Sequence, residues 1–168
     1  AEFARQTRQD MTYERLLAPL DGFAATLEQF ARAGGLGANV TLPFKLEAFR
    51  LADNLSDRAK LAGAVNTLRF EPDGKIFGDN TDGTGLVHDL TKNLNMHLRG
   101  KKILVLGAGG AVRGVLGPLL KQNPALLVIA NRTVPKAKEL AKTFAQFGKI
   151  EGVGYDELVG KRFDVVIN

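Results

Sequence analysis

The stretch KILVLGAGGA, residues 102–111, decides the fold class of this 168-residue chain. Residues 102–106 form a nearly continuous apolar run, which predicts a strand that is buried on both faces of a parallel sheet. The glycines that follow favour a sharp turn, and a helix is predicted from there to about Gln122. A strand, a glycine-rich turn and a helix in this order are typical of α/β folds that bind nucleotides.

Strands and helices continue to alternate downstream of this stretch. Further apolar strands are predicted at residues 126–130, 150–153 and 163–167. Helices are predicted between them, at residues 135–147 and 156–159. This alternation predicts an α/β fold with a Rossmann-like, doubly wound parallel sheet.

The region before residue 95 combines helices with short strands. Helical spacing and capping residues predict helices at residues 2–8, 23–33, 45–52, 57–61 and 82–94. Apolar runs that end at proline, glycine or turn residues predict strands at residues 13–18, 38–42, 65–70 and 76–77. The helical pattern ends before residues 95–101, so we predict an α/β domain over residues 1–98 and a Rossmann-like domain over residues 99–168.

The composition is that of an ordinary globular protein, with 45% hydrophobic and 24% charged residues and no cysteine. The net charge of +5 is uneven, because Lys and Arg outnumber Asp and Glu only after residue 100. That surplus fits a polyanionic small molecule, a solvated basic face or, last in rank, nucleic acid, because no basic block carries interleaved aromatics. No apolar run approaches the length of a membrane span.

The glycine-rich turn predicts a site for the pyrophosphate of a dinucleotide. Gly107 and Gly109 match the usual fingerprint, whereas its third glycine position is taken by Val112. A helix N-terminus supplies unpaired N–H groups and partial positive charge at such a turn. A tight connection between a strand and a helix, without a ligand, is the competing interpretation.

The end of the second strand favours NADP over NAD. Sites for NAD usually carry an acidic residue there, to bind the ribose 2′-hydroxyl. This chain has Asn131, Arg132 and Thr133 instead, with Lys136 one turn further on. Arginine and lysine are suited to a 2′-phosphate, and a solvated basic loop is the alternative.

Five segments, in this order, carry a resemblance to one enzyme family. They are NVTLPFK at residues 39–45, GAVNT at 63–67, GDNTDG at 78–83, GAGGA at 107–111 and NRT at 131–133. With them the chain resembles the shikimate dehydrogenase family along essentially its whole length. The resemblance implies reversible, NADPH-dependent reduction of 3-dehydroshikimate to shikimate in aromatic amino-acid biosynthesis. It implies a cytoplasmic enzyme with a small-molecule substrate, no nucleic acid or membrane partner, and leaves room for a homodimer.

The resemblance also implies roles for individual residues. Lys45 and Asp82 match the family's catalytic pair, which also contacts substrate, and Thr41 and Asn66 match substrate-binding positions. The cofactor positions are Gly107, Ala108, Gly109, Gly110 and Ala111 for the pyrophosphate, Asn131, Arg132, Thr133 and Lys136 for the adenosine phosphate, and Asp57.

Each of the substrate-side residues also has a purely structural interpretation. A lysine that opens a helix, such as Lys45, is usually a surface residue, and Asp82 or Asp57 could simply cap a helix. Asn66 could be a turn residue at the end of a strand. His88 and His97 lack the spacing of metal ligands, so no metal site is expected.

The family pattern extends beyond both ends of this sequence. It implies a strand and a serine-containing substrate loop before residue 1, and further strands, closing helices and a glutamine after Asn168. We therefore expect a fragment with little activity of its own and with an uncertain choice between shikimate and quinate. Two alternatives stay open: a quinate/shikimate dehydrogenase of broader cofactor use, and a non-catalytic NADP-binding module.

Overall fold

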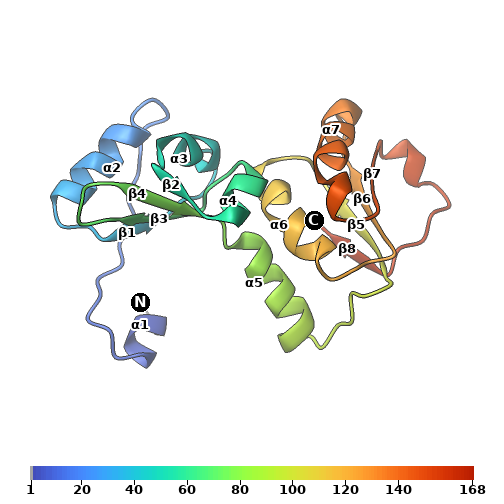
Figure 1. Cartoon of the computed structure of the whole chain (residues 1–168), viewed down its shortest axis with the longest axis horizontal. Coiled ribbons are helices and arrows are strands. Elements are labelled where there is room, and N and C mark those ends of the chain that lie inside the picture. Colours follow the sequence, from blue (N-terminus) through green and yellow to red (C-terminus); the bar gives the residue numbers. More distant parts are fainter. Residues whose placement is uncertain (1) are drawn as a thin grey trace. The chain divides into compact units, whose positions relative to one another are not determined.

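The computed structural model describes residues 2–168 (Figure 1). By its internal contacts the chain falls into two compact units, Ala1–Gly35 and Leu36–Asn168. The first unit contains helix α1 (Glu2–Gln6) and helix α2 (Phe23–Arg32). Both helices lie where the sequence predicts them, and α2 buries Phe23 and Leu27 on one face.

The strand predicted at residues 13–18 is wrong. Residues 9–19 have no regular secondary structure, and the side chain of Leu17 is 95% exposed. A strand is stable only when its backbone groups pair with a neighbour. Both sheets of the structure are built from later residues, and the described part of the first unit contains no strand with which this run could pair.

The first sheet lies in the second unit and is mixed. Its strands are β1 (Gly37–Asn39), β2 (Asn54–Leu55), β3 (Thr67–Phe70) and β4 (Ile76–Asp79), in the order β1-β3-β4-β2. Strand β3 pairs antiparallel with β1 and β4, and β2 runs parallel to β4. Strand β2 was not predicted from the sequence. The strand predicted at residues 38–42 is too long, because β1 ends at Asn39. A turn follows, in which the Phe44 N–H donates to the Thr41 carbonyl.

Three helices accompany this sheet: α3 (Lys45–Leu51), α4 (Asp57–Ala62) and α5 (Asp82–His88). A π-helical turn, Asp89–Asn93, continues α5, so the predicted helix over residues 82–94 is correct in extent but not in its last turn. Ser56 caps α4, since its Oγ accepts the Ala59 N–H at 3.1 Å. The cap is therefore Ser56 and not Asp57.

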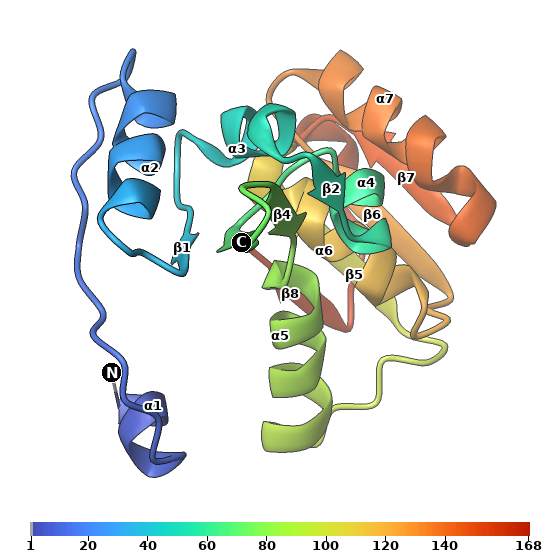
Figure 2. The ribbon, with the colours of Figure 1, turned by 60° about the vertical axis from the view of Figure 1, so that its left-hand side comes forward.

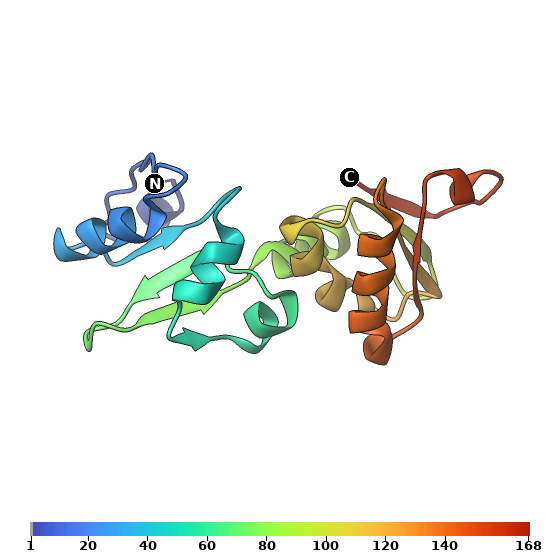
Figure 3. The ribbon, with the colours of Figure 1, turned by 90° about the horizontal axis from the view of Figure 1, so that it is seen from above.

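The second sheet is entirely parallel. It contains β5 (Lys102–Leu106), β6 (Leu126–Ala130), β7 (Ile150–Val153) and β8 (Val165–Ile167), in the order β7-β6-β5-β8. Two helices connect the strands, α6 (Gly110–Leu120) and α7 (Val134–Phe144), and short 3₁₀ turns lie at Ala145–Phe147 and Asp156–Leu158 (Figure 3). This order is that of a Rossmann-like sheet, which confirms the doubly wound parallel sheet predicted from the sequence.

Apolar side chains from strands and helices fill the core of the second sheet. Ile103, Leu127, Leu116, Leu140 and Phe144 are each at most 1% exposed. Burial of the strands beneath helices explains their continuous apolar runs. Among residues 2–168, no helix combines the length and the apolar character needed to cross a membrane.

Helices α5 and α6 approach each other through glycine (Figure 2). A Cβ atom placed on Gly83 would lie 2.3 Å from the Gly114 carbonyl oxygen and 2.9 Å from Val115 Cα. Only glycine allows this distance between two backbones. The first turn of α5 is thereby fixed against α6, the helix that follows the glycine-rich turn.

Candidate active site

Lys45 and Asp82 meet although they lie far apart in the sequence. Lys45 opens α3, Asp82 opens α5, and the Lys45 Nζ atom is 2.7 Å from Asp82 Oδ2. The two side chains are only 13% and 27% exposed. A lysine at the surface would be far more exposed, so the simple surface interpretation of Lys45 does not hold.

Asn66 holds the other oxygen of the same carboxylate. Its Nδ2 donates to Asp82 Oδ1 at 2.6 Å and to Thr81 Oγ1 at 3.0 Å. Its Oδ1 accepts the Thr81 N–H and the Thr67 hydroxyl, both at 2.9 Å. Both carboxylate oxygens of Asp82 therefore have defined partners, and the carboxylate is fixed in orientation beside the ammonium group.

Backbone hydrogen bonds join the segment that carries Lys45 to the segment that carries Asn66. The Val40 N–H donates to the Asn66 carbonyl at 2.7 Å, and the Val65 N–H donates to the Lys45 carbonyl at 2.9 Å. Thr41 follows Val40 and is exposed in the turn before α3. The structure thus brings the segment of Thr41 next to Asn66, while a contact of its side chain with substrate stays a prediction.

The glycine-rich turn presents an open surface at the start of α6. Gly107 has a φ of +104°, and its N–H donates to the Ala130 carbonyl at 2.7 Å. Cβ atoms placed on Gly109 and Gly110 would meet no heavy atom within 4 Å. The turn is thus free to receive a ligand close to its backbone, next to the N–H groups of a helix of 11 residues. These features fit a pyrophosphate.

The loop after β6 lies beside this turn. Leu106 at the end of β5 pairs in register with Ala130 at the end of β6, so the segments that follow them emerge at the same sheet edge. Asn131 shapes the loop, because its Nδ2 donates to the Thr133 carbonyl at 3.0 Å. The side chains of Arg132 and Lys136 are exposed and cationic, which suits an additional phosphate.

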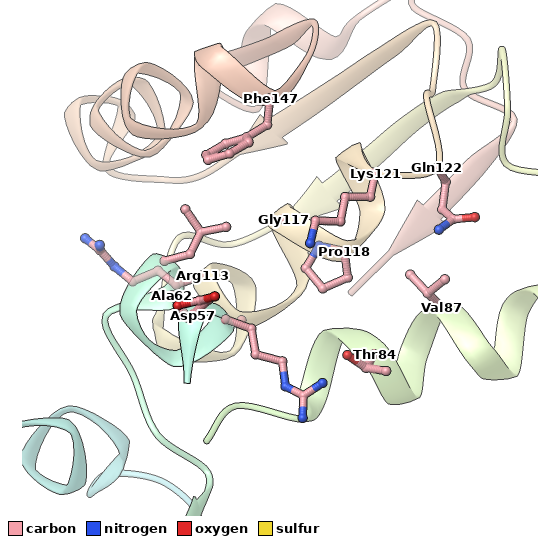
Figure 4. A pocket seen from close by; sticks show the side chains of 13 residues that line it. Asp57, Ala62, Thr84, Val87, Arg113, Gly117, Pro118, Lys121, Gln122 and Phe147 are labelled. Atoms are coloured by element: carbon pink, nitrogen blue, oxygen red, sulfur yellow. The ribbon is translucent and has the colours of Figure 1, made fainter. Parts of the chain in front are cut away.

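Asp57 stands apart from both groups of residues. Its side chain is fully exposed, and its contact with Lys60 is long, at 3.9 Å. It lines a cavity of about 550 Å³ that side chains of α4, α5, α6 and Phe147 enclose (Figure 4). That cavity includes neither the Lys45–Asp82 pair nor the glycine-rich turn, so a cofactor contact of Asp57 stays a prediction.

One polar group near the site was not predicted from the sequence. The Asp79 carboxylate accepts hydrogen bonds from Arg58 Nε at 2.7 Å, from Ser56 Oγ at 2.5 Å and from the Asn80 N–H at 2.7 Å. The hydrogen bond from Arg58 is the main cause that lowers the pKa of Asp79 from 3.8 to about 2. Asp79 lies within the GDNTDG segment, which was the only sequence signal for it.

We expect the Asp79→Asn variant to lose about 1 kcal/mol of unfolding free energy at neutral pH, since Arg58 is partly exposed and solvent screens the pair. The folded-state pKa is depressed, so this stabilisation is present above the ordinary pKa of 3.8 and is lost as the pH falls towards 2. Urea unfolding of both proteins at several pH values measures the difference. Asp73→Asn, at an exposed pair with Lys75, is the control and should lose less, because solvent screens both partners. A difference that persists unchanged at low pH would contradict the assignment.

Within the described residues, no group of three His, Cys, Asp or Glu side chains is arranged to hold a metal ion.

Comparisons with known proteins match both halves of the chain. Residues 1–68 match the family model described as shikimate dehydrogenase substrate binding domain, and residues 89–168 match the model described as shikimate / quinate 5-dehydrogenase. A shikimate dehydrogenase (NADP(+)) of Laribacter hongkongensis is 61% identical over 99% of this chain. The chain spans 61% of the length of that relative.

Two solved structures extend the match to the fold. Shikimate dehydrogenase from Aquifex aeolicus is 35% identical with a TM-score of 0.84, over 98% of this chain and 59% of that one. Shikimate 5-dehydrogenase from Thermus thermophilus, solved in complex with NADP(H) and shikimate, is also 35% identical. Its TM-score is 0.77, over 88% of this chain and 54% of that one.

Proposed function

Because the chain belongs to the shikimate dehydrogenase family, we propose that its protein reduces 3-dehydroshikimate to shikimate, reversibly and with NADPH. This reaction belongs to the biosynthesis of aromatic amino acids. The observation that carries the proposal is the Lys45–Asp82 pair, joined at 2.7 Å and fixed by Asn66, in one compact unit with an open glycine-rich turn.

On the substrate side, the reaction requires a group that stabilises negative charge on the ketone oxygen and transfers a proton to it. An ammonium group next to that oxygen stabilises the developing negative charge and can donate a proton. We assign this role to Lys45. Asp82 orients the hydroxyl that this oxygen becomes in shikimate, and it keeps the ammonium in place. Thr41 and Asn66 bind the remaining polar groups of the substrate.

On the cofactor side, the protein must bind NADPH and distinguish it from NADH. When bound, NADPH supplies the hydride. We assign residues 107–111 to its pyrophosphate and residues 131–133, with Lys136, to its adenosine phosphate, and we include Asp57 as a further contact. The proposal divides the chain into a substrate-binding domain, residues 1–98, and an NADP-binding domain, residues 99–168.

The test is turnover by the full-length protein, followed through the absorbance of NADPH. We expect oxidation of shikimate with NADP, and slower turnover with NAD or with quinate. Binding of NADP without any shikimate-dependent signal from a folded sample would favour a non-catalytic module instead. The proposal places the enzyme in the cytoplasm, and light scattering of the same sample tests whether it is a homodimer.

A further inference from the structure

Asn80 is a buried polar residue to which the proposed reaction assigns no task. It lies between β4 and α5, and its side chain is 1% exposed. Its neighbours in the sequence are Asp79, which pairs with Arg58, and Thr81, which bonds to Asn66. An amide buried to this extent is costly unless its polar atoms have partners, so its contacts indicate its purpose.

The side-chain amide of Asn80 makes two hydrogen bonds with the backbone. Its Oδ1 accepts the N–H of Asp82 at 3.2 Å, and its Nδ2 donates to the Ala64 carbonyl at 3.0 Å. Only this orientation of the amide works, because an N–H cannot accept and a carbonyl cannot donate.

The first of these bonds fixes the start of α5. The N–H groups in the first turn of a helix have no partner within the helix. Thr81, at the N-cap of α5, makes no capping bond with its side chain. Asn80 therefore supplies the acceptor for the backbone of Asp82, the residue whose carboxylate pairs with Lys45.

The same amide also touches the helix of the nucleotide turn. A Cβ atom placed on Gly114 of α6 would lie 2.7 Å from Asn80 Oδ1 and 2.9 Å from its Nδ2. Gly114 comes one turn after Gly110, where α6 begins. Asn80 thus lies between three elements: the segment before β3, the first residue of α5, and α6.

We propose that Asn80 is a positioning residue, which holds the Asp82–Lys45 pair at a fixed place relative to the nucleotide helix. This inference rests on the proposed function. Asn80 touches no reacting atom and acts through the backbone of Asp82. A shift of about 1 Å in a reacting group can cost on the order of 10²-fold in rate, so the effect on turnover is large.

The first experiment compares Asn80→Ala with the wild type in the full-length protein. We expect kcat for shikimate oxidation to fall about 10²-fold, with the Kd for NADP changed less than about twofold. Hydrogen exchange at the amide of Asp82, measured by NMR, should become faster, because that amide loses its acceptor. Asn93→Ala is the matched control, since the side chain of Asn93 is exposed and bonds to Asp89 in the turn that follows α5.

The second experiment uses Asn80→Asp, which keeps the shape of the side chain and replaces the amide with a carboxyl group that can be titrated. A protonated carboxyl group can accept from the Asp82 N–H and donate to the Ala64 carbonyl, as the amide does, whereas a carboxylate cannot donate. Burial raises the pKa of a carboxyl group. We expect the activity of this variant, relative to the wild type, to recover as the pH falls, whereas that of Asn80→Ala stays low.

The outcomes separate the two proposals. Wild-type turnover together with an unchanged kcat in Asn80→Ala, or unchanged exchange at Asp82, would overturn the positioning role alone. A pH profile of Asn80→Asp that runs parallel to the wild type would do the same, even if Asn80→Ala does not fold. No shikimate-dependent turnover by the wild type would overturn the proposed function, and the positioning role with it.

Discussion

Replacing Lys45 with methionine is expected to lower kcat by about 10²- to 10⁴-fold, the usual contribution of a positioned acid–base group. Methionine retains much of the length and the apolar contacts of lysine but removes the ammonium group. Asp82 then loses its partner at 2.7 Å, and the cation that we propose for the ketone oxygen is removed. Steady-state kinetics with shikimate and NADP measure the loss, and NADP binding should be unchanged because the glycine-rich turn lies on other elements.

Lys60→Met is the matched control for this variant. Lys60 lies on α4, is 62% exposed and has only a long contact with Asp57. Its replacement should leave kcat within about twofold of the wild type, because substitutions on an exposed surface have small effects. If Lys45→Met retained wild-type turnover, Lys45 would have no part in the chemistry.

The second large effect concerns the choice of cofactor. Arg132→Ala should weaken NADP binding by about 10- to 100-fold, since a hydrogen bond between charged groups contributes about 1.5–3 kcal/mol. The affinity for NAD should change little, because NAD has no 2′-phosphate. Fluorescence titration of both cofactors on the same sample gives the ratio directly.

Lys138→Ala distinguishes a specific contact from a general effect of charge. Lys138 lies on α7 near Lys136 and is exposed, so it contributes the same charge to the region without belonging to the predicted phosphate site. Its replacement should affect both cofactors slightly and equally. An equal loss of NAD and NADP affinity in Arg132→Ala would contradict a 2′-phosphate contact.

The parallel sheet could be predicted closely from the sequence. Residues 102–106, 126–130 and 150–153 coincide with β5, β6 and β7. Strands β5 and β6 could be predicted because strands that are buried on both faces need nearly continuous apolar residues. The first sheet could be predicted less well from the sequence. Strand β2 has only two residues, too few for any periodicity, and it is stabilised by pairing with β4. The run at residues 13–18 has the composition of a strand, but composition does not supply a partner.

The candidate site could be predicted as a set of residues but not as a network. Resemblance to the family pointed to Lys45 and Asp82, and the structure joins them across 37 positions of the sequence. The contacts of Asn80 with Ala64 and of Asp79 with Ser56 and Arg58 were not accessible, because these partners lie 16 to 23 residues away and no local pattern encodes such pairs. Asparagine and aspartate in a loop look the same whether they cap, bridge or face solvent.

The hydrogen bonds of Asp82 have a consequence for molecular recognition. Each carboxylate oxygen of Asp82 already accepts one hydrogen bond, from Lys45 or from Asn66, and has a further lone pair for a hydroxyl that enters this space. A ligand that lacks this hydroxyl leaves the Lys45–Asp82 ion pair intact, and no buried group loses its partner. Strong rejection of an analogue arises when its missing group strands a buried donor or acceptor, and here it would strand none. In the proposed reaction, the pair would therefore govern whether a bound molecule reacts, while the choice among similar polyols would fall to side chains around it.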